Sequence, residues 1–141
     1  MEVPVNYWAV LLAAVSSMAI GSLWYSKAMF LDSWVKLGRV KTDPNWDNSK
    51  MKWMLLMVFG GSLVTAYVLA HVAYISSTYF QNAFLQDTLV AAFLVWLGFS
   101  AARIATHDLF ENRRKKFTLI NVGNEFATLM VMGLIIGLMG V

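Results

Sequence analysis

The stretch TLINVGNEFATLMVMGLIIG, residues 118–137, decides the fold. It is apolar along most of its length and long enough for one membrane-spanning helix, because a bilayer core needs about 20 such residues. Glu125 interrupts it. A charge near the centre of a membrane helix costs about 2.5–3.5 kcal/mol on insertion scales. Such a residue therefore needs a partner or serves a function.

The composition of the whole chain agrees with a membrane protein. Of its 141 residues, 59% are hydrophobic and 13% are charged, against about 25% charged in a soluble domain. Four apolar blocks predict helices at roughly 7–23, 53–75, 89–106 and 118–139. We therefore predict an all-α integral membrane protein, with residues 1–141 forming a single bundle of four transmembrane helices. The first block follows Glu2 and shows no cleavage-site pattern, so we expect it to remain as the first helix.

Positive charge predicts how the bundle is oriented. All 11 basic residues lie between the first and second helices or at and between the third and fourth. Since positive loops stay on the cytoplasmic side, we expect both termini on the non-cytoplasmic side of an inner membrane. No nucleic-acid recognition motif accompanies these charges, so no nucleic-acid partner is expected. We expect four of the basic residues to bind anionic lipid headgroups: Arg113, Arg114, Lys115 and Lys116.

The first basic loop contains a short amphipathic helix. In WYSKAMFLDSWVKLG, residues 24–38, Phe30, Trp34 and Leu37 recur at helical spacing. This interfacial helix either lies in the headgroup region or packs against the ends of the bundle. An interfacial aromatic belt, which anchors helices to the membrane surface, is predicted to include Trp24, Tyr25, Trp34, Trp46 and Trp53.

Two stretches resemble a known family. VNYWAVLLAAVSSMAIGSLWYSKAMFLDSWVKLG resembles the opening pattern N-Y-x-A-V…G-x-L-W-Y-S-P-x-x-F-G-x-x-W of the family catalogued as domain of unknown function 1761. LVWLGFSAARIATHDLFENRRKKFTLINVGNEFATLMVMGLIIG resembles its closing pattern W-L-G-F…L-F-E-x-R…I-N-A-G…M-G-x-I-x-G. The resemblance covers about half of the chain and implies a small four-helix membrane protein, without implying an activity. The chain departs from the family pattern at Lys27, Asp32, Val122, Asn124 and Glu125.

Polar residues form a stripe on each of the last two helices. Their spacing puts Thr118, Asn121, Glu125 and Thr128 on one face, and Ser100, Arg103, His107 and Glu111 on another. The short connection NRRKK predicts antiparallel neighbours. Folding about residue 114 then aligns three pairs: Arg103 with Glu125, His107 with Asn121, and Ser100 with Thr128.

The opposite charges of Arg103 and Glu125 leave three interpretations open. The first is a structural salt bridge that holds the two helices together. The second is a functional site on a proton, ion or anion path. The third is a protonated, neutral Glu125.

Other chemistry is poorly represented in the sequence. His107, Asp108 and Glu111 could ligate a metal, but a solvated helix end accounts for them as well. His71 is expected to form a hydrogen bond with a neighbouring helix. No catalytic or nucleotide-binding motif is present. We therefore expect no enzymatic activity, no cofactor and no metal.

Small residues predict close helix packing and shape the functional hypotheses. SMAIG contains Ser17 and Gly21, and GLIIG contains Gly133 and Gly137; small residues four apart let helix backbones approach. The leading hypothesis is a bundle that self-associates or scaffolds a partner. The alternative is a small homo-oligomeric channel or transporter for protons, ions or a small anion, with its polar path on the third and fourth helices.

Overall fold

The computed structural model describes residues 3–38 and 48–140, which are helical over most of their length. Arg39, Lys41 and Trp46 lie outside the described residues. No strand occurs in the described ranges, so this part of the chain is all-α. The elements are α1 (Tyr7–Trp24), α2 (Leu31–Gly38), α3 (Asn48–Phe80), α4 (Phe84–Val95), the π-helical segment η1 (Trp96–Ala101), α5 (Ala102–Phe110) and α6 (Lys115–Met139).

Four of the helices are long and apolar enough to cross a membrane, which confirms the predicted four-helix architecture. We refer to them as spans; the third runs without a break through α4, η1 and α5, from Phe84 to Phe110. The predicted limits of the first and last helices are close to those observed, but the second and third helices are longer than predicted. Polar residues end an apolar block without ending a helix. For example, the Thr78 hydroxyl donates to the Tyr74 carbonyl at 2.8 Å within the last turns of α3.

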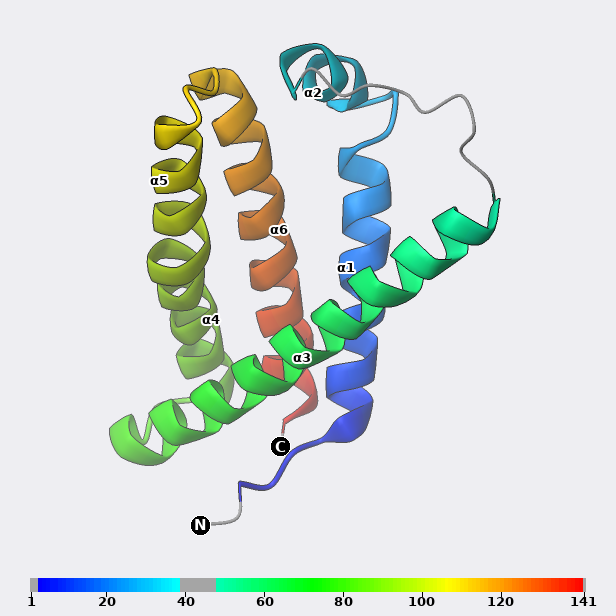
Figure 1. The fold of residues 1–141 in the computed structure, drawn as a ribbon. Coiled ribbons are helices and arrows are strands. Elements are labelled where there is room, and N and C mark those ends of the chain that lie inside the picture. Colours follow the sequence, from blue (N-terminus) through cyan, green and yellow to red (C-terminus); the bar gives the residue numbers. More distant parts are fainter. Residues whose placement is uncertain (1–2, 39–47, 141) are drawn as a thin grey trace.

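The helix α6 lies at the centre of the fold, with α1 on one side and α4 on the other. The helix α3 runs across α1 and α4 and is steeply inclined to the other helices (Figure 1). The inclination is compatible with the length of α3, because 33 residues at about 1.5 Å each exceed a hydrocarbon core of about 30 Å. A helix that is too long for the membrane tilts.

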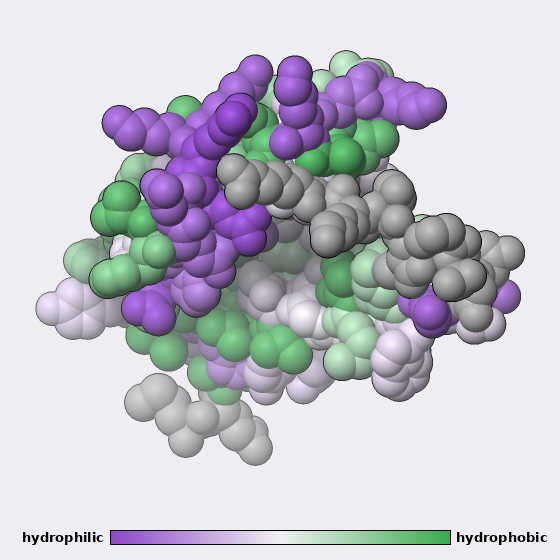
Figure 2. Space-filling view, turned by 45° about the horizontal axis from the view of Figure 1, so that its top comes forward, coloured by the Kyte–Doolittle hydropathy of each residue, from purple (hydrophilic) through white to green (hydrophobic). Residues whose placement is uncertain are grey.

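The two ends of the bundle differ in character. The start of α1 and the end of α6 lie at one end, and α2 lies at the opposite end with the turn between α5 and α6 (Figure 1). We call the latter the basic end, because the exposed residues Arg113, Arg114, Lys115 and Lys116 lie there. Figure 2 shows hydrophilic residues gathered at this end.

Small side chains fill the interfaces between the helices. Ala13, Ala66 and Ala92 are fully buried, and the Ser17 hydroxyl donates to the Ser62 hydroxyl at 2.8 Å where α1 meets α3. In the absence of a hydrophobic force between helices in lipid, close approach through small residues and polar contacts holds them together. Small side chains therefore contribute to the core beside larger ones such as Leu129 and Met132.

The predicted packing glycines differ in their surroundings. A Cβ atom at Gly137 would lie 2.7 Å from Leu85 Cδ1 and 3.0 Å from Leu85 Cα, and one at Gly133 would lie 2.9 Å from Ala92 Cβ. These two residues let α6 approach α4. Gly21 has no atom within 4 Å of such a position, so it does not pack against the described part of the chain.

The interfacial helix packs against the bundle. From α2, the Trp34 ring stacks on Phe117 of α6, with ring centroids 6.2 Å apart. Of the two arrangements that the sequence left open, packing on the bundle end is the one observed.

The approach of α6 to α4 gives a first prediction. Gly137→Ala should lower the free energy of unfolding by about 1–3 kcal/mol, because the added methyl overlaps the backbone of Leu85. The matched control is Gly21→Ala, where nothing lies within 4 Å of the added Cβ. Denaturant unfolding in detergent micelles measures both variants, and equal stability of the two would contradict the packing.

Candidate functional site

Three tryptophan side chains converge on three consecutive residues of α6. The indole Nε1 of Trp24 donates to the carbonyl oxygen of Ile120, and that of Trp96 donates to the carbonyl oxygen of Val122, each at 3.0 Å. The indole Nε1 of Trp34 donates to Asn121 Oδ1, also at 3.0 Å. We call this group, with its acceptors on residues 120–122, the indole cluster. It ties the end of α1, the helix α2 and the segment η1 to one stretch of α6.

Asn121 is the polar centre of the indole cluster. Its Oδ1 also accepts from the Tyr25 hydroxyl at 3.1 Å, so one amide oxygen satisfies two aromatic donors. Burial, with a smaller contribution from the Glu125 carboxylate, raises the pKa of Tyr25 to about 12. The hydroxyl therefore keeps its proton and remains a donor over the physiological pH range.

Gly123 makes room for one of the indole rings. A Cβ atom at this position would lie 2.9 Å from Trp24 Cζ2, so only glycine leaves space for the ring against α6. On its other side, the Trp24 ring packs against Phe30, with centroids 4.9 Å apart. In the stretch INVG, residues 120–122 therefore accept hydrogen bonds, and Gly123 leaves room for a ring.

The arrangement corrects two expectations from the sequence. Trp24, Tyr25 and Trp34 were predicted as interfacial anchors, but their polar atoms are directed into the bundle, while Trp53 is 65% exposed. A buried indole N–H requires an acceptor, and the bundle supplies one. The pairing of Asn121 with His107 was also wrong, because Asn121 faces α1 and α2.

Glu125 lies one turn along α6 from Asn121, in an open groove. The groove has a volume of about 430 Å³ and runs between α3, η1 and α6. Its walls are apolar, with Val68, Phe99 and Leu129 among them, and its other polar side chains are Thr65 and Ser100. The carboxylate is half-buried and forms no hydrogen bond or ion pair with any described residue.

Arg103 does not reach this groove. It is exposed and lines a separate hollow formed by α5 with Thr106, His107 and Phe110. Within the described ranges no ion pair joins it to Glu125, so the predicted salt bridge inside one chain is not formed. Ser100 and Thr128 are likewise not joined by a hydrogen bond in this part of the chain.

The register of the two helices explains why these pairs do not meet. The Thr118 hydroxyl donates to Asp108 Oδ2 at 2.7 Å, which centres the connection on residue 113 instead of 114. The π-helical turns of η1 also carry extra residues, and each extra residue rotates the following side chains by about 100°. Ser100 and Arg103, predicted on one face, therefore line different hollows.

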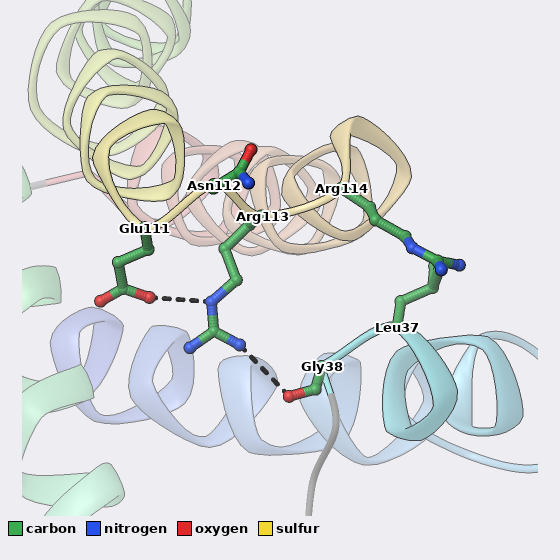
Figure 3. A pocket seen from close by; sticks show the side chains of 6 residues that line it. All are labelled: Leu37, Gly38, Glu111, Asn112, Arg113 and Arg114. Atoms are coloured by element: carbon green, nitrogen blue, oxygen red, sulfur yellow. Dashed lines mark hydrogen bonds and ion pairs between the residues drawn. The ribbon is translucent and has the colours of Figure 1, made fainter.

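The turn at the basic end has its own network (Figure 3). The guanidinium of Arg113 donates to Glu111 Oε2 at 2.8 Å and to the carbonyl oxygen of Gly38 at 3.2 Å. The hydrogen bond from Arg113 to Glu111 and the positive charge of Arg113 lower the pKa of Glu111 below its usual value. A hollow of about 560 Å³ lies between α2 and this turn, and Arg114 also lines it.

The two histidines and three further acidic residues make local contacts. His107 Nδ1 lies 3.5 Å from Glu111 Oε1, whereas Asp108 turns to Thr118, so the three do not converge on one metal position. His71 Nδ1 contacts the carbonyl oxygen of Tyr67 in its own helix at 2.9 Å, not a neighbouring helix as predicted. Asp87, which sequence analysis did not single out, is buried in the first turn of α4, where it accepts from Asn82 and complements the helix dipole.

Comparison with known proteins gives a family match. A family model described as "Protein of unknown function (DUF1761)" matches residues 8–137. No curated protein and no solved structure matches the chain. Four of the stretches that carried the resemblance in sequence build the indole cluster: LWYS, the tryptophan of α2, WLGF and INVG.

The two donors on Asn121 give a second prediction. Asn121→Ala leaves the Tyr25 hydroxyl and the Trp34 indole without an acceptor, which should lower the free energy of unfolding by about 1–3 kcal/mol. The control is Asn124→Ala, since Asn124 Oδ1 is buried without a partner. Thermal unfolding in detergent compares the two, and a larger loss for the Asn124 variant would contradict the assignment.

Proposed function

The chain belongs to the DUF1761 family, and from its geometry we propose that it is a non-enzymatic membrane bundle that associates with further copies of itself. The observation that carries this proposal is the first half of α3. The buried residues of α3 begin at Ala66, whereas the large apolar side chains between Met51 and Val58 are all exposed. The first turns of this half, residues 49–58, extend away from the other helices in Figure 1, so they offer a surface that the described part of the chain does not cover.

Two glycines make this half of α3 suited to helix packing. Neither Gly60 nor Gly61 has a described atom within 4 Å of an added Cβ, so no residue of the described ranges packs against their open faces. Close contact between membrane helices is favoured where small residues let the backbones approach. A second copy of the chain would supply the missing helix.

The proposed setting is an inner membrane with the basic end in the cytoplasm. Positively charged loops are retained on that side, and the start of α1 and the end of α6 lie at the opposite end of the bundle. Anionic lipid headgroups would then surround residues 113–116, at about 1 kcal/mol for each basic residue. The hollow beside Arg113 and Arg114 is a suitable position for a lipid phosphate.

A second candidate function is a small homo-oligomeric transporter or channel for protons, ions or a small anion. One observation favours it: Thr65, Ser100 and Glu125 line a single groove among the spans. Ionisable residues inside membrane proteins often mark such paths. A path through the membrane would need several copies, because four helices enclose little space.

Self-association predicts a defined mass. In lipid discs prepared with excess lipid, mass photometry or native mass spectrometry should detect two or more copies per disc. Gly61→Leu should weaken this association by about tenfold, because a bulky residue separates closely packed helices. Leu134→Phe, at an exposed position on α6, is the control and should leave the mass unchanged. A monomer under all conditions would contradict the proposal.

The orientation predicts opposite labelling of two sites. The chain has no cysteine, so single cysteines introduced as Gln81→Cys and Lys115→Cys report on the two ends of the bundle. A membrane-impermeant thiol reagent added to intact cells should label position 81 and spare position 115. The reverse pattern would overturn the proposed orientation, and permeabilised cells supply the control in which both react.

A further inference from the structure

Two opposite charges lie inside the spans and do not meet within one chain. Glu125 lies in the groove beside α3, and Arg103 lines the hollow on α5. In the described ranges neither side chain forms an ion pair. Charged side chains inside membrane helices usually pair with one another. Inside the described spans, each chain therefore carries one unpaired carboxylate and one unpaired guanidinium. The carboxylate of one copy could pair with the guanidinium of a second copy.

The two charges lie at similar depth. The hydrogen bond between Asp108 and Thr118 fixes a common level for α5 and α6. At about 1.5 Å per residue, Arg103 lies about 7.5 Å from this level and Glu125 about 10.5 Å from it. The difference of about 3 Å is smaller than the reach of an arginine side chain.

From these positions we infer that Arg103 of one copy enters the groove of a second copy and pairs with Glu125 there. This inference rests on the proposed self-association and names the contact that directs it. In a dimer whose two-fold axis is normal to the membrane, equivalent residues keep the same depth, so depth-matched charges can meet across the interface. The same symmetry forms the pair twice.

The surroundings of both residues fit this contact. The groove around Glu125 is lined by apolar residues such as Val68 and Phe99, and it is open on one side. Arg103 lines its hollow with Phe110, which is 88% exposed, and with the polar residues Thr106, His107 and Glu111. An arginine can lay its stem along an apolar side chain while its guanidinium reaches a carboxylate, which it binds through two parallel hydrogen bonds.

A mixing experiment tests whether these two charges, and not another contact, join the two copies. Copies carrying Arg103→Gln keep Glu125, and copies carrying Glu125→Gln keep Arg103. Neither variant can form the pair with itself, but a mixed dimer forms it once. Donor and acceptor dyes on Gln81→Cys, in vesicles of neutral lipid, report each combination by energy transfer.

We expect the mixed pair to associate about threefold to tenfold more tightly than either variant with itself, in line with the modest strength of polar pairs in membranes. His107→Gln on α5 and Thr128→Val on α6 are matched controls, and their mixture should behave as the unmodified chain. Equal transfer in the mixed and unmixed samples would overturn the inference while leaving self-association intact. Absence of transfer for the unmodified chain would overturn both.

If the single variants fold poorly, a chain in which the two charges exchange positions provides the test. The chain carrying Arg103→Glu and Glu125→Arg retains both charges and should associate with itself. It should not associate with the unmodified chain, because like charges then face each other at both contacts. Transfer between the exchanged and unmodified chains as strong as in either sample alone would contradict the pairing.

Discussion

The fold depends on the requirement that an indole N–H buried among membrane helices find an acceptor. Trp24, Trp34 and Trp96 come from three separate segments, and all three donate to residues 120–122 of α6. Each of these hydrogen bonds fixes one element against the central helix, so the positions of α2 and η1 both follow from this one stretch. The adjoining Gly123 is the steric counterpart, since a larger residue would displace the ring of Trp24.

The sequence reveals the helices more readily than it reveals the contacts between them. Four long apolar blocks reveal four helices, because a bilayer imposes a minimum length on each. The sequence does not show whether Trp24 faces lipid or α6, because the amphipathic ring of a tryptophan suits either environment. The stretch WLGFSA gives no sign of its π-helical turns, which displace Arg103 from the face of Ser100. The predicted register of the last two helices was wrong for that reason.

The segments that the indole cluster does not hold expose apolar side chains, or contain a charged group that forms no ion pair in the described ranges. The first half of α3 lies away from the bundle and exposes its apolar side chains and its glycines. The groove that contains Glu125 lies between α3 and α6. One half of the bundle is thus well packed, and the other half is open. The open half contains the features from which we propose a role in association.

Hydrogen exchange at the indole N–H groups, followed by NMR in detergent micelles, tests this account most directly. The signals of Trp24, Trp34 and Trp96 should exchange slowly, and those of Trp8 and Trp53, which are 72% and 65% exposed, should exchange rapidly. Substitution of Asn121 by Ala should accelerate exchange at Trp34 far more than at Trp96. Similar exchange rates at all five indoles would contradict the central role of α6.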